Sequence, residues 1–254
     1  MRLLRILFFH ELRSLAFAAP TCVAAVVFLS LMGWIYHLAL ADAVGVSHAD
    51  TPVQTYFRAF AVPLLFIVPL LTMRSFAEER RLGTLGALFS TPVHAAQVVV
   101  AKFAAVYAFY LLLWAGALLF PLVAWGMLGG LYGDERLLSL PSLLGGAVFV
   151  SVSGLLYVAA GIFASALTRS TLVAALLTFC ALFVLVVFGR VLQQVPTGGY
   201  ASVERLLASA EYLDTFHHLD VFLRGIVDTR PLFLFGSGAL AMLGLATLAV
   251  GARV

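Results

Sequence analysis

The sequence predicts an all-α integral membrane protein with six transmembrane helices in one domain, residues 1–254. Hydrophobic residues make up 63% of the chain and charged residues 11%, whereas soluble globular chains contain about 45–50% apolar and about 25% charged residues. The apolar residues fall into six long stretches, and about 20 apolar residues are enough to cross a bilayer. The intervals between them add an N-terminal interfacial helix, a cytoplasmic amphipathic helix and short extracytoplasmic helices between spans five and six.

The first segment, residues 2–16, is expected to be an interfacial helix rather than a signal peptide. Charged residues such as Glu11 interrupt its apolar run too early for the uncharged core of a signal peptide. In an amphipathic helix, its basic residues Arg2, Arg5 and Arg13 would face lipid phosphates.

The apolar stretches predict the positions of the spans. The second should be kinked, because Pro63 and Pro69 each remove a backbone donor. The fourth contains Gly154, Gly161, Ala164 and Ser165, which favour close packing inside the chain over the alternative of a dimerisation face. The predicted spans cover about 20–41, 56–73, 103–128, 143–167, 171–189 and 231–250.

A long charged interval, residues 74–102, separates the second span from the third. Thr91 followed by Pro92 predicts a helix start, since Thr caps a helix and Pro suits its first position. The interval is therefore expected to hold a short amphipathic helix at the membrane surface, a sharp turn and a helix that enters the bilayer at Lys102. Apolar residues recur in it at helical spacing, at Leu82, Leu85, Leu88 and Phe89.

A second polar interval, residues 196–230, is expected to form short helices at the opposite surface. Apolar residues recur at helical spacing from Val203 to Leu213, and another helix is predicted over Phe216–Ile226. Four polar residues occur here, and they could bind a metal, since carboxylate and imidazole groups at i, i+3 lie on one helix face. The favoured interpretation is that they form the polar face of an interfacial helix. These residues are Asp214, His217, His218 and Asp220.

Motifs for catalysis or for cofactor binding are missing from the sequence. The chain contains no Gly-x-x-x-x-Gly-Lys-Ser/Thr, so a P-loop for nucleotide is not expected. Cys22 and Cys180 fall inside predicted spans, which argues against a disulfide or a zinc site. No predicted span carries a carboxylate at mid-depth, which argues against a proton-coupled transporter. No basic run with interleaved aromatic residues indicates nucleic acid.

The distribution of charge predicts the orientation. With both termini and residues 74–102 on one side, that side carries nine basic and three acidic residues, and the other carries six basic and nine acidic residues. The positive-inside rule makes the first side cytoplasmic. Both termini are then cytoplasmic, which requires an even number of spans, and six satisfies this requirement.

Several motifs resemble those of ABC type-2 permeases, most closely the branch of gliding-motility-type exporters. The resemblance covers nearly the whole chain. In the interval 74–102, which corresponds to the coupling region of that family, it is carried by Glu79-Arg80-Arg81-Leu82-Gly83-Thr84, a Leu-rich turn, Thr91-Pro92 and Lys102. Elsewhere it is carried by His10-Glu11-Leu12-Arg13, Ala19-Pro20, Glu211-Tyr212-Leu213, Phe216-His217 and the residues from Arg224 to Arg230.

This resemblance implies a transport subunit rather than an enzyme. The chain would be an exporter permease in the inner membrane, forming the substrate path with a second permease subunit and coupled through residues 78–92 to a separate ATPase that binds ATP and Mg²⁺. The charged residues would contact the ATPase or the N-terminal helix, with a simple interfacial anchor as the alternative. The residues implied in ATPase coupling are Glu78, Glu79, Arg80, Arg81, Gly83, Thr84, Leu85, Leu88, Phe89 and Pro92.

Two other classes of function compete with this interpretation. A passive channel or secondary transporter is disfavoured because ionisable residues at mid-depth and detectable internal repeats are missing from the sequence. A membrane scaffold subunit without transport has no positive feature in its favour. A neighbouring ATPase reading frame would favour the permease over both. No residue is assigned to substrate.

Overall fold

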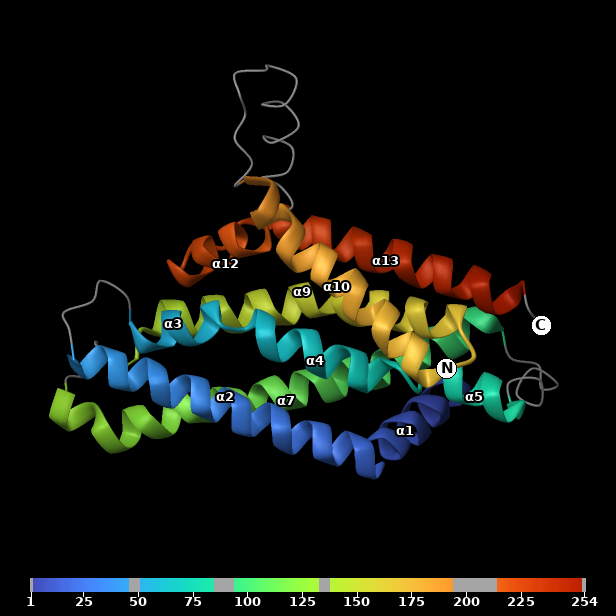
Figure 1. The fold of residues 1–254 in the computed structure, drawn as a ribbon, viewed down its shortest axis with the longest axis horizontal. Coiled ribbons are helices and arrows are strands. Elements are labelled where there is room, and N and C mark those ends of the chain that lie inside the picture. The colour runs from blue at the N-terminus through green and yellow to red at the C-terminus, as the bar shows by residue number, and fades with distance from the viewer. Residues whose placement is uncertain (1, 46–50, 85–93, 133–137, 194–213, 253–254) are drawn as a thin grey trace, which may run out of the picture.

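A computed structural model describes residues 2–45, 51–84, 94–132, 138–193 and 214–252, which form helices joined by turns (Figure 1). In this part of the chain, six helices are long and apolar enough to cross a membrane, which confirms the predicted fold class. The described helices are α1 (Arg2–Ala16), α2 (Ala19–Gly45), α3 (Pro52–Arg58), α4 (Ala61–Thr72), α5 (Ala77–Leu82), α7 (Ala95–Tyr132), α9 (Leu140–Leu167), α10 (Thr171–Gln193), α12 (Thr215–Leu223) and α13 (Thr229–Gly251).

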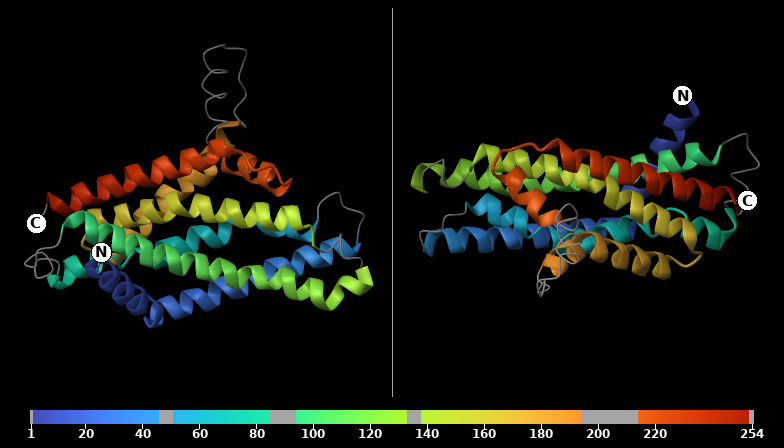
Figure 2. Two further views of the ribbon diagram at one scale, coloured as in Figure 1. Left: turned by 180° about the vertical axis from the view of Figure 1, so that it is seen from behind. Right: turned by 90° about the horizontal axis from the view of Figure 1, so that it is seen from above.

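Helix α9 is the central helix of the bundle, and α13 packs along it while α7, α4 and α10 lie around it (Figures 1 and 2). In its membrane-crossing window 67% of residues are buried, against 22% in α10 and in α13. The outer helices therefore present apolar faces outward, as lipid contact requires, whereas α9 contacts protein on most sides.

Small residues let neighbouring helices approach α9 closely. A Cβ atom at Gly154 would lie 2.3 Å from the Tyr110 ring of α7, and one at Gly161 would lie 2.4 Å from Thr72 Oγ1 of α4. Ala164 and Ser165 are buried as well. These four residues therefore serve packing inside the chain, which is the favoured interpretation of the sequence, and their side chains do not form an outward dimerisation face.

The second predicted span is interrupted before its first proline. The helix breaks at Ala59 and Phe60, between α3 and α4, which places Pro63 in the first turn of α4. Proline is tolerated there because the first N–H groups of a helix have no intrahelical partner, while its ring would clash with the Ala59 carbonyl in a continuous helix. Pro69 lies inside α4, which continues through it.

Helix α7 begins at Ala95 and passes through Lys102, as the sequence predicts, whereas the predicted start at Thr91 and Pro92 lies outside the described residues. One further element differs from its expected limits. Helix α12 covers Thr215–Leu223 and ends before Gly225, whose φ of +80° is left-handed and favours glycine. The helix expected over 203–213 lies outside the described residues.

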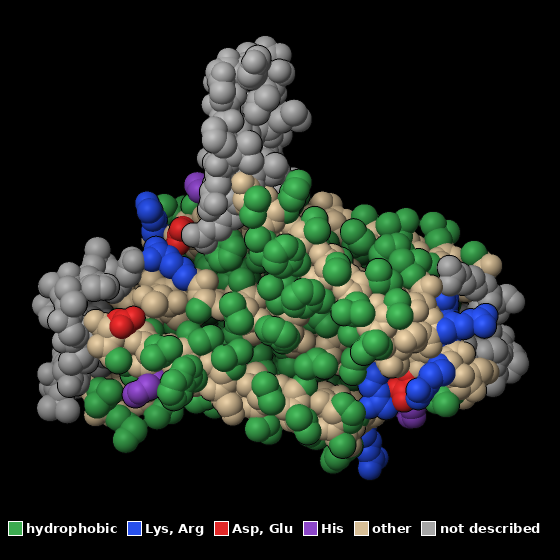
Figure 3. Space-filling model, viewed as in Figure 1, with side chains coloured by type: hydrophobic (Ala, Val, Ile, Leu, Met, Phe, Trp, Pro, Cys, Tyr) green, Lys and Arg blue, Asp and Glu red, His purple; other side chains and the backbone are tan. Residues whose placement is uncertain are grey.

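The bundle has two polar ends, which we name the α5 end and the α12 end. Helices α1 and α5, the start of α7 and the last turn of α13 lie at the α5 end, whereas α3, α12 and the start of α9 lie toward the α12 end (Figures 1 and 2). Hydrophobic side chains cover the middle of the face in Figure 3, and Lys and Arg gather toward the two ends. This distribution fits a bilayer around the middle of the bundle.

Candidate coupling site at the α5 end

Helix α5 is a short helix whose charges match its backbone dipole. Glu78 and Glu79 stand in its first turn, and Arg80 and Arg81 in its last. Acidic residues near the N-terminus and basic residues near the C-terminus stabilise a helix. Gly83 ends α5 in the left-handed conformation with φ of +72°, which glycine adopts without steric cost.

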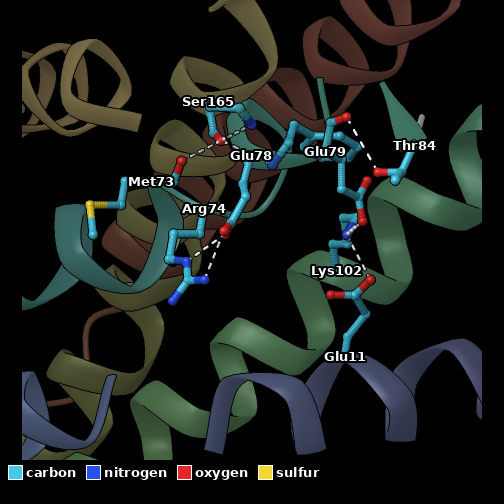
Figure 4. Close-up of polar contacts among 10 residues, drawn as sticks. Glu11, Met73, Arg74, Glu78, Glu79, Thr84, Lys102 and Ser165 are labelled. Carbon is cyan, nitrogen blue, oxygen red and sulfur yellow. Dashed lines mark hydrogen bonds and ion pairs between the residues drawn. The ribbon is translucent and has the colours of Figure 1, made fainter. Parts of the chain in front are cut away.

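The N-terminus of α5 is capped by a residue from another helix. Ser165 Oγ of α9 accepts hydrogen bonds from the backbone N–H groups of Phe76 at 3.1 Å and Ala77 at 3.2 Å. The same hydroxyl donates to the Met73 carbonyl at 3.2 Å (Figure 4). Phe76, the residue at the N-cap position, makes no side-chain cap of its own. The start of α5 is therefore tied to the central helix.

Lys102 joins three helices through ion pairs. Its side chain on α7 is 3% exposed, and Nζ lies 2.6 Å from Glu11 Oε1 of α1 and 2.7 Å from Glu79 Oε1 of α5 (Figure 4). Nζ also lies 5.5 Å from the centre of the Phe76 ring. A buried ammonium group is costly unless it is paired, so these contacts hold α1 and α5 against α7. We name Glu11, Glu79 and Lys102 the Lys102 cluster.

Two arginines add hydrogen bonds that hold α5 in place, one to α13 and one within the segment that leads into α5. Arg80 Nη2 donates to the Ala249 carbonyl at 3.2 Å, in the last turn of α13, where a cation also interacts favourably with the helix dipole. Arg74 Nη2 donates to Glu78 Oε1 at 2.8 Å, an i, i+4 pair that joins the turn before α5 to its first turn. Helix α5 is thus connected to α1, α7, α9 and α13.

The outer side of α5 stays open. Arg81 is exposed, and Leu82 is an apolar side chain that is 63% exposed. Gly83 and Thr84 are exposed too, and Thr84 Oγ1 donates to the Glu79 carbonyl at 3.3 Å. An apolar and a basic side chain at an exposed helix end are available to a partner protein.

The residues predicted for coupling thus divide into groups. Those that are half-buried and form ion pairs or hydrogen bonds to other segments are Glu78, Glu79 and Arg80, and those that are exposed are Arg81, Gly83 and Thr84. Those that lie outside the described residues are Leu85, Leu88, Phe89 and Pro92.

Sequence reasoning missed three contributions at this site: the acceptor role of Glu11, the burial of Lys102 and the cap from Ser165. A lone lysine within an apolar helical stretch was available as a signal for a buried, paired cation. No comparable signal marked Ser165, because serines are common in membrane helices and most bond their own helix.

Two of the polar residues of the second interval, Asp214 and Asp220, serve structural roles. Asp214 caps α12 by accepting from Phe216 N at 2.9 Å, and Asp220 pairs with Arg58 Nε at 2.8 Å. In the described part of the chain, no three His, Cys, Asp or Glu side chains lie close enough together to hold a metal ion.

Comparison with known proteins identifies the family. A family model described as an ABC-2 family transporter protein matches residues 8–251, from α1 to the end of α13. A search among curated proteins gave no match. The match covers all six candidate spans and the interval 74–102, and it indicates a membrane permease subunit of an ABC transporter. The gliding-motility branch stays a prediction. The chain therefore belongs to the ABC-2 family of transporter proteins.

Proposed function

We propose that the chain is the permease subunit of an ATP-driven exporter in the inner membrane. A separate ATPase binds ATP and Mg²⁺ and docks on residues 78–92, and a second permease subunit, identical or related, completes the substrate path. Membership of the ABC-2 family supports the transport role, and the missing P-loop motif agrees with hydrolysis by a partner.

The observation that carries this proposal is the set of contacts around α5. Its outer side presents Arg81 and Leu82, while its inner side is bound to α1, α7, α9 and α13 by the Lys102 cluster, Ser165 and Arg80. A partner that moves α5 would act on all four helices, because packed interiors transmit displacement rather than absorb it. Such a helix is suited to passing a change in the ATPase to the membrane bundle.

The proposed orientation places the α5 end in the cytoplasm. Helix α1, α5 and the last turn of α13 lie together at this end, in agreement with the grouping used for the charge count. Nine of the 15 basic residues belong to this group, and the positive-inside rule favours the cytoplasm for it. Both termini are cytoplasmic in this arrangement.

The proposal is tested with an ATPase that a neighbouring reading frame encodes or that copurifies with the permease, by measuring how tightly it binds wild type and Leu88→Asp. Burying a leucine contributes about 1.5–3 kcal/mol, and an unpaired carboxylate in an apolar groove adds a further cost. The variant is therefore expected to bind at least about tenfold more weakly, while its insertion is unchanged.

The matched control is Ile226→Asp, which places the same charge on a residue that is 60% exposed at the α12 end, away from the proposed docking segment. It is expected to bind the ATPase as wild type does. Normal binding by Leu88→Asp contradicts the placement of the docking surface. Loss of the whole protein in Leu88→Asp places Leu88 in the core and contradicts it equally. Transport by the permease without any ATPase contradicts the proposed function itself.

A further inference from the structure

Helix α1 has an inner and an outer face with different chemistry. The inner face packs Leu12 and Leu15 against the core and brings Glu11 to Lys102. The outer face exposes Arg5, Arg13 and large apolar side chains such as Phe9, and Phe17, the residue after the helix, is 80% exposed. Exposed aromatic residues interleaved with arginines are typical of a helix that lies in the lipid headgroup region.

A shallow, open hollow lies on α1 and is lined by His10, Arg13, Ser14 and Phe17. The lining contains an arginine, an imidazole and a hydroxyl, and no carboxylate. The guanidinium carbon of Arg13 lies 5.9 Å from the centre of the Phe17 ring, so this arginine rests over the ring. The set offers donors to an anion beside an apolar surface.

The depth of the hollow in the membrane follows from its distance in sequence to the first span. Only Phe17 and Ala18 separate α1 from α2, whose candidate span begins at Ala19. The hollow therefore lies where the first span starts, at the level of the headgroups. Glu11, the acidic neighbour of His10, is bound by Lys102 and is not among the residues that line the hollow.

We propose that this hollow binds the phosphate headgroup of an anionic membrane lipid. Arg13 supplies the charge, Ser14 and His10 supply hydrogen bonds, and Phe17 contacts the upper part of the acyl chains. Anionic lipids fit better than zwitterionic ones because the hollow offers no carboxylate to a choline or an ethanolamine group.

Lipid binding at the hollow has a consequence for coupling, which rests on the proposed function. Glu11 and the hollow belong to the same helix, so a lipid that holds α1 in place also holds Glu11 against Lys102 and Glu79 of α5. Transport coupling is then sensitive to the anionic lipid content. Lipid binding itself needs no ATPase.

The test uses the purified full chain, without ATPase, reconstituted in nanodiscs of phosphatidylcholine with a minor fraction of phosphatidylglycerol. Native mass spectrometry then measures the phosphatidylglycerol retained per chain. Arg13→Gln is expected to lower the affinity for this lipid roughly fivefold, the factor for one basic residue near an anionic surface. The control Arg169→Gln removes the same charge from the exposed turn between α9 and α10, and it is expected to retain lipid as wild type does.

Two outcomes overturn the inference: Arg13→Gln retains as much phosphatidylglycerol as wild type, or Arg169→Gln loses as much as Arg13→Gln. The second outcome indicates diffuse attraction to the surface rather than a site. If Arg13→Gln does not accumulate, Ser14→Ala is measured, and retention equal to wild type again overturns the inference. Because the assay contains no ATPase, its result is independent of whether residues 78–92 dock one.

Discussion

At each polar end of the bundle an ion pair joins two helices, but the two ion pairs differ in how far their side chains are exposed. At the α5 end Lys102 is 3% exposed and holds two carboxylates. At the α12 end Arg58 and Asp220 are each 42% exposed. A buried pair is costly to disrupt, because the charge that remains is desolvated, whereas an exposed pair contributes little.

The α12 end is held by close backbone packing instead. Ser142 Oγ of α9 donates to the Leu223 carbonyl at 2.7 Å, and α12 passes so close to Gly145 that a Cβ there would lie 1.9 Å from Phe222 O. Buried ion pairs therefore specify the position of α5, whereas close packing against Gly145 specifies the position of α12. Four substitutions test this difference, in decreasing order of expected effect.

Lys102→Met is expected to have the largest effect. It leaves Glu11 and Glu79 without their shared cation, and removing one partner of a buried ion pair typically costs about 3–5 kcal/mol. Thermal unfolding in detergent measures the loss, with Lys102→Arg as the variant that keeps the charge and is expected to lose less. Unchanged stability in Lys102→Met contradicts a buried, paired Lys102.

Gly145→Ala is expected to destabilise the α12 end by about 1–3 kcal/mol, since the added methyl group meets a backbone carbonyl that has little freedom to move. Gly236→Ala in α13 is the matched control, because no atom of another helix lies within 4 Å of its Cβ position, and it is expected to be neutral or slightly stabilising. Equal melting temperatures for the two variants contradict close packing of α12 on α9.

Ser165→Ala is expected to cost about 1–2 kcal/mol and to loosen the start of α5. It leaves two backbone N–H groups, those of Phe76 and Ala77, without their acceptor. Hydrogen exchange at these two amides is expected to accelerate. Ser151→Ala is the control on the same helix, because the Ser151 hydroxyl donates to a carbonyl of its own helix, Ala147 O, at 2.7 Å. Exchange that stays as slow as in wild type shows that Ser165 does not protect α5.

Asp220→Asn is expected to have the smallest effect, at most about 1 kcal/mol, because the Arg58–Asp220 pair is exposed to solvent. The difference from wild type should shrink further as salt is added. Thermal unfolding at low and at high salt measures the loss of stability and its dependence on salt. A loss as large as that of Lys102→Met removes the distinction between the two ends.

The sequence by itself determined the fold class, the presence of a separate helix before the first span and the charged interval 74–102. These features depend on local quantities, namely the length of apolar runs, the spacing of apolar residues and the sign of nearby charges. It also marked the small residues of α9 as packing positions, since glycine and alanine in a membrane helix favour close approach. The coupling role of residues 78–92 stays a prediction.

The tertiary structure decided which partners the polar residues have. The ion pairs of Lys102 with Glu11 and Glu79 join residues from three helices, and the cap from Ser165 reaches α5 from α9. It also decided that the second span breaks at Ala59, where α3 passes into α4. The physical reason is that a buried charge or N–H group needs a partner within about 3 Å, and folding brings that partner from a distant segment. The spacing of residues along one helix carries no information about which segment supplies it.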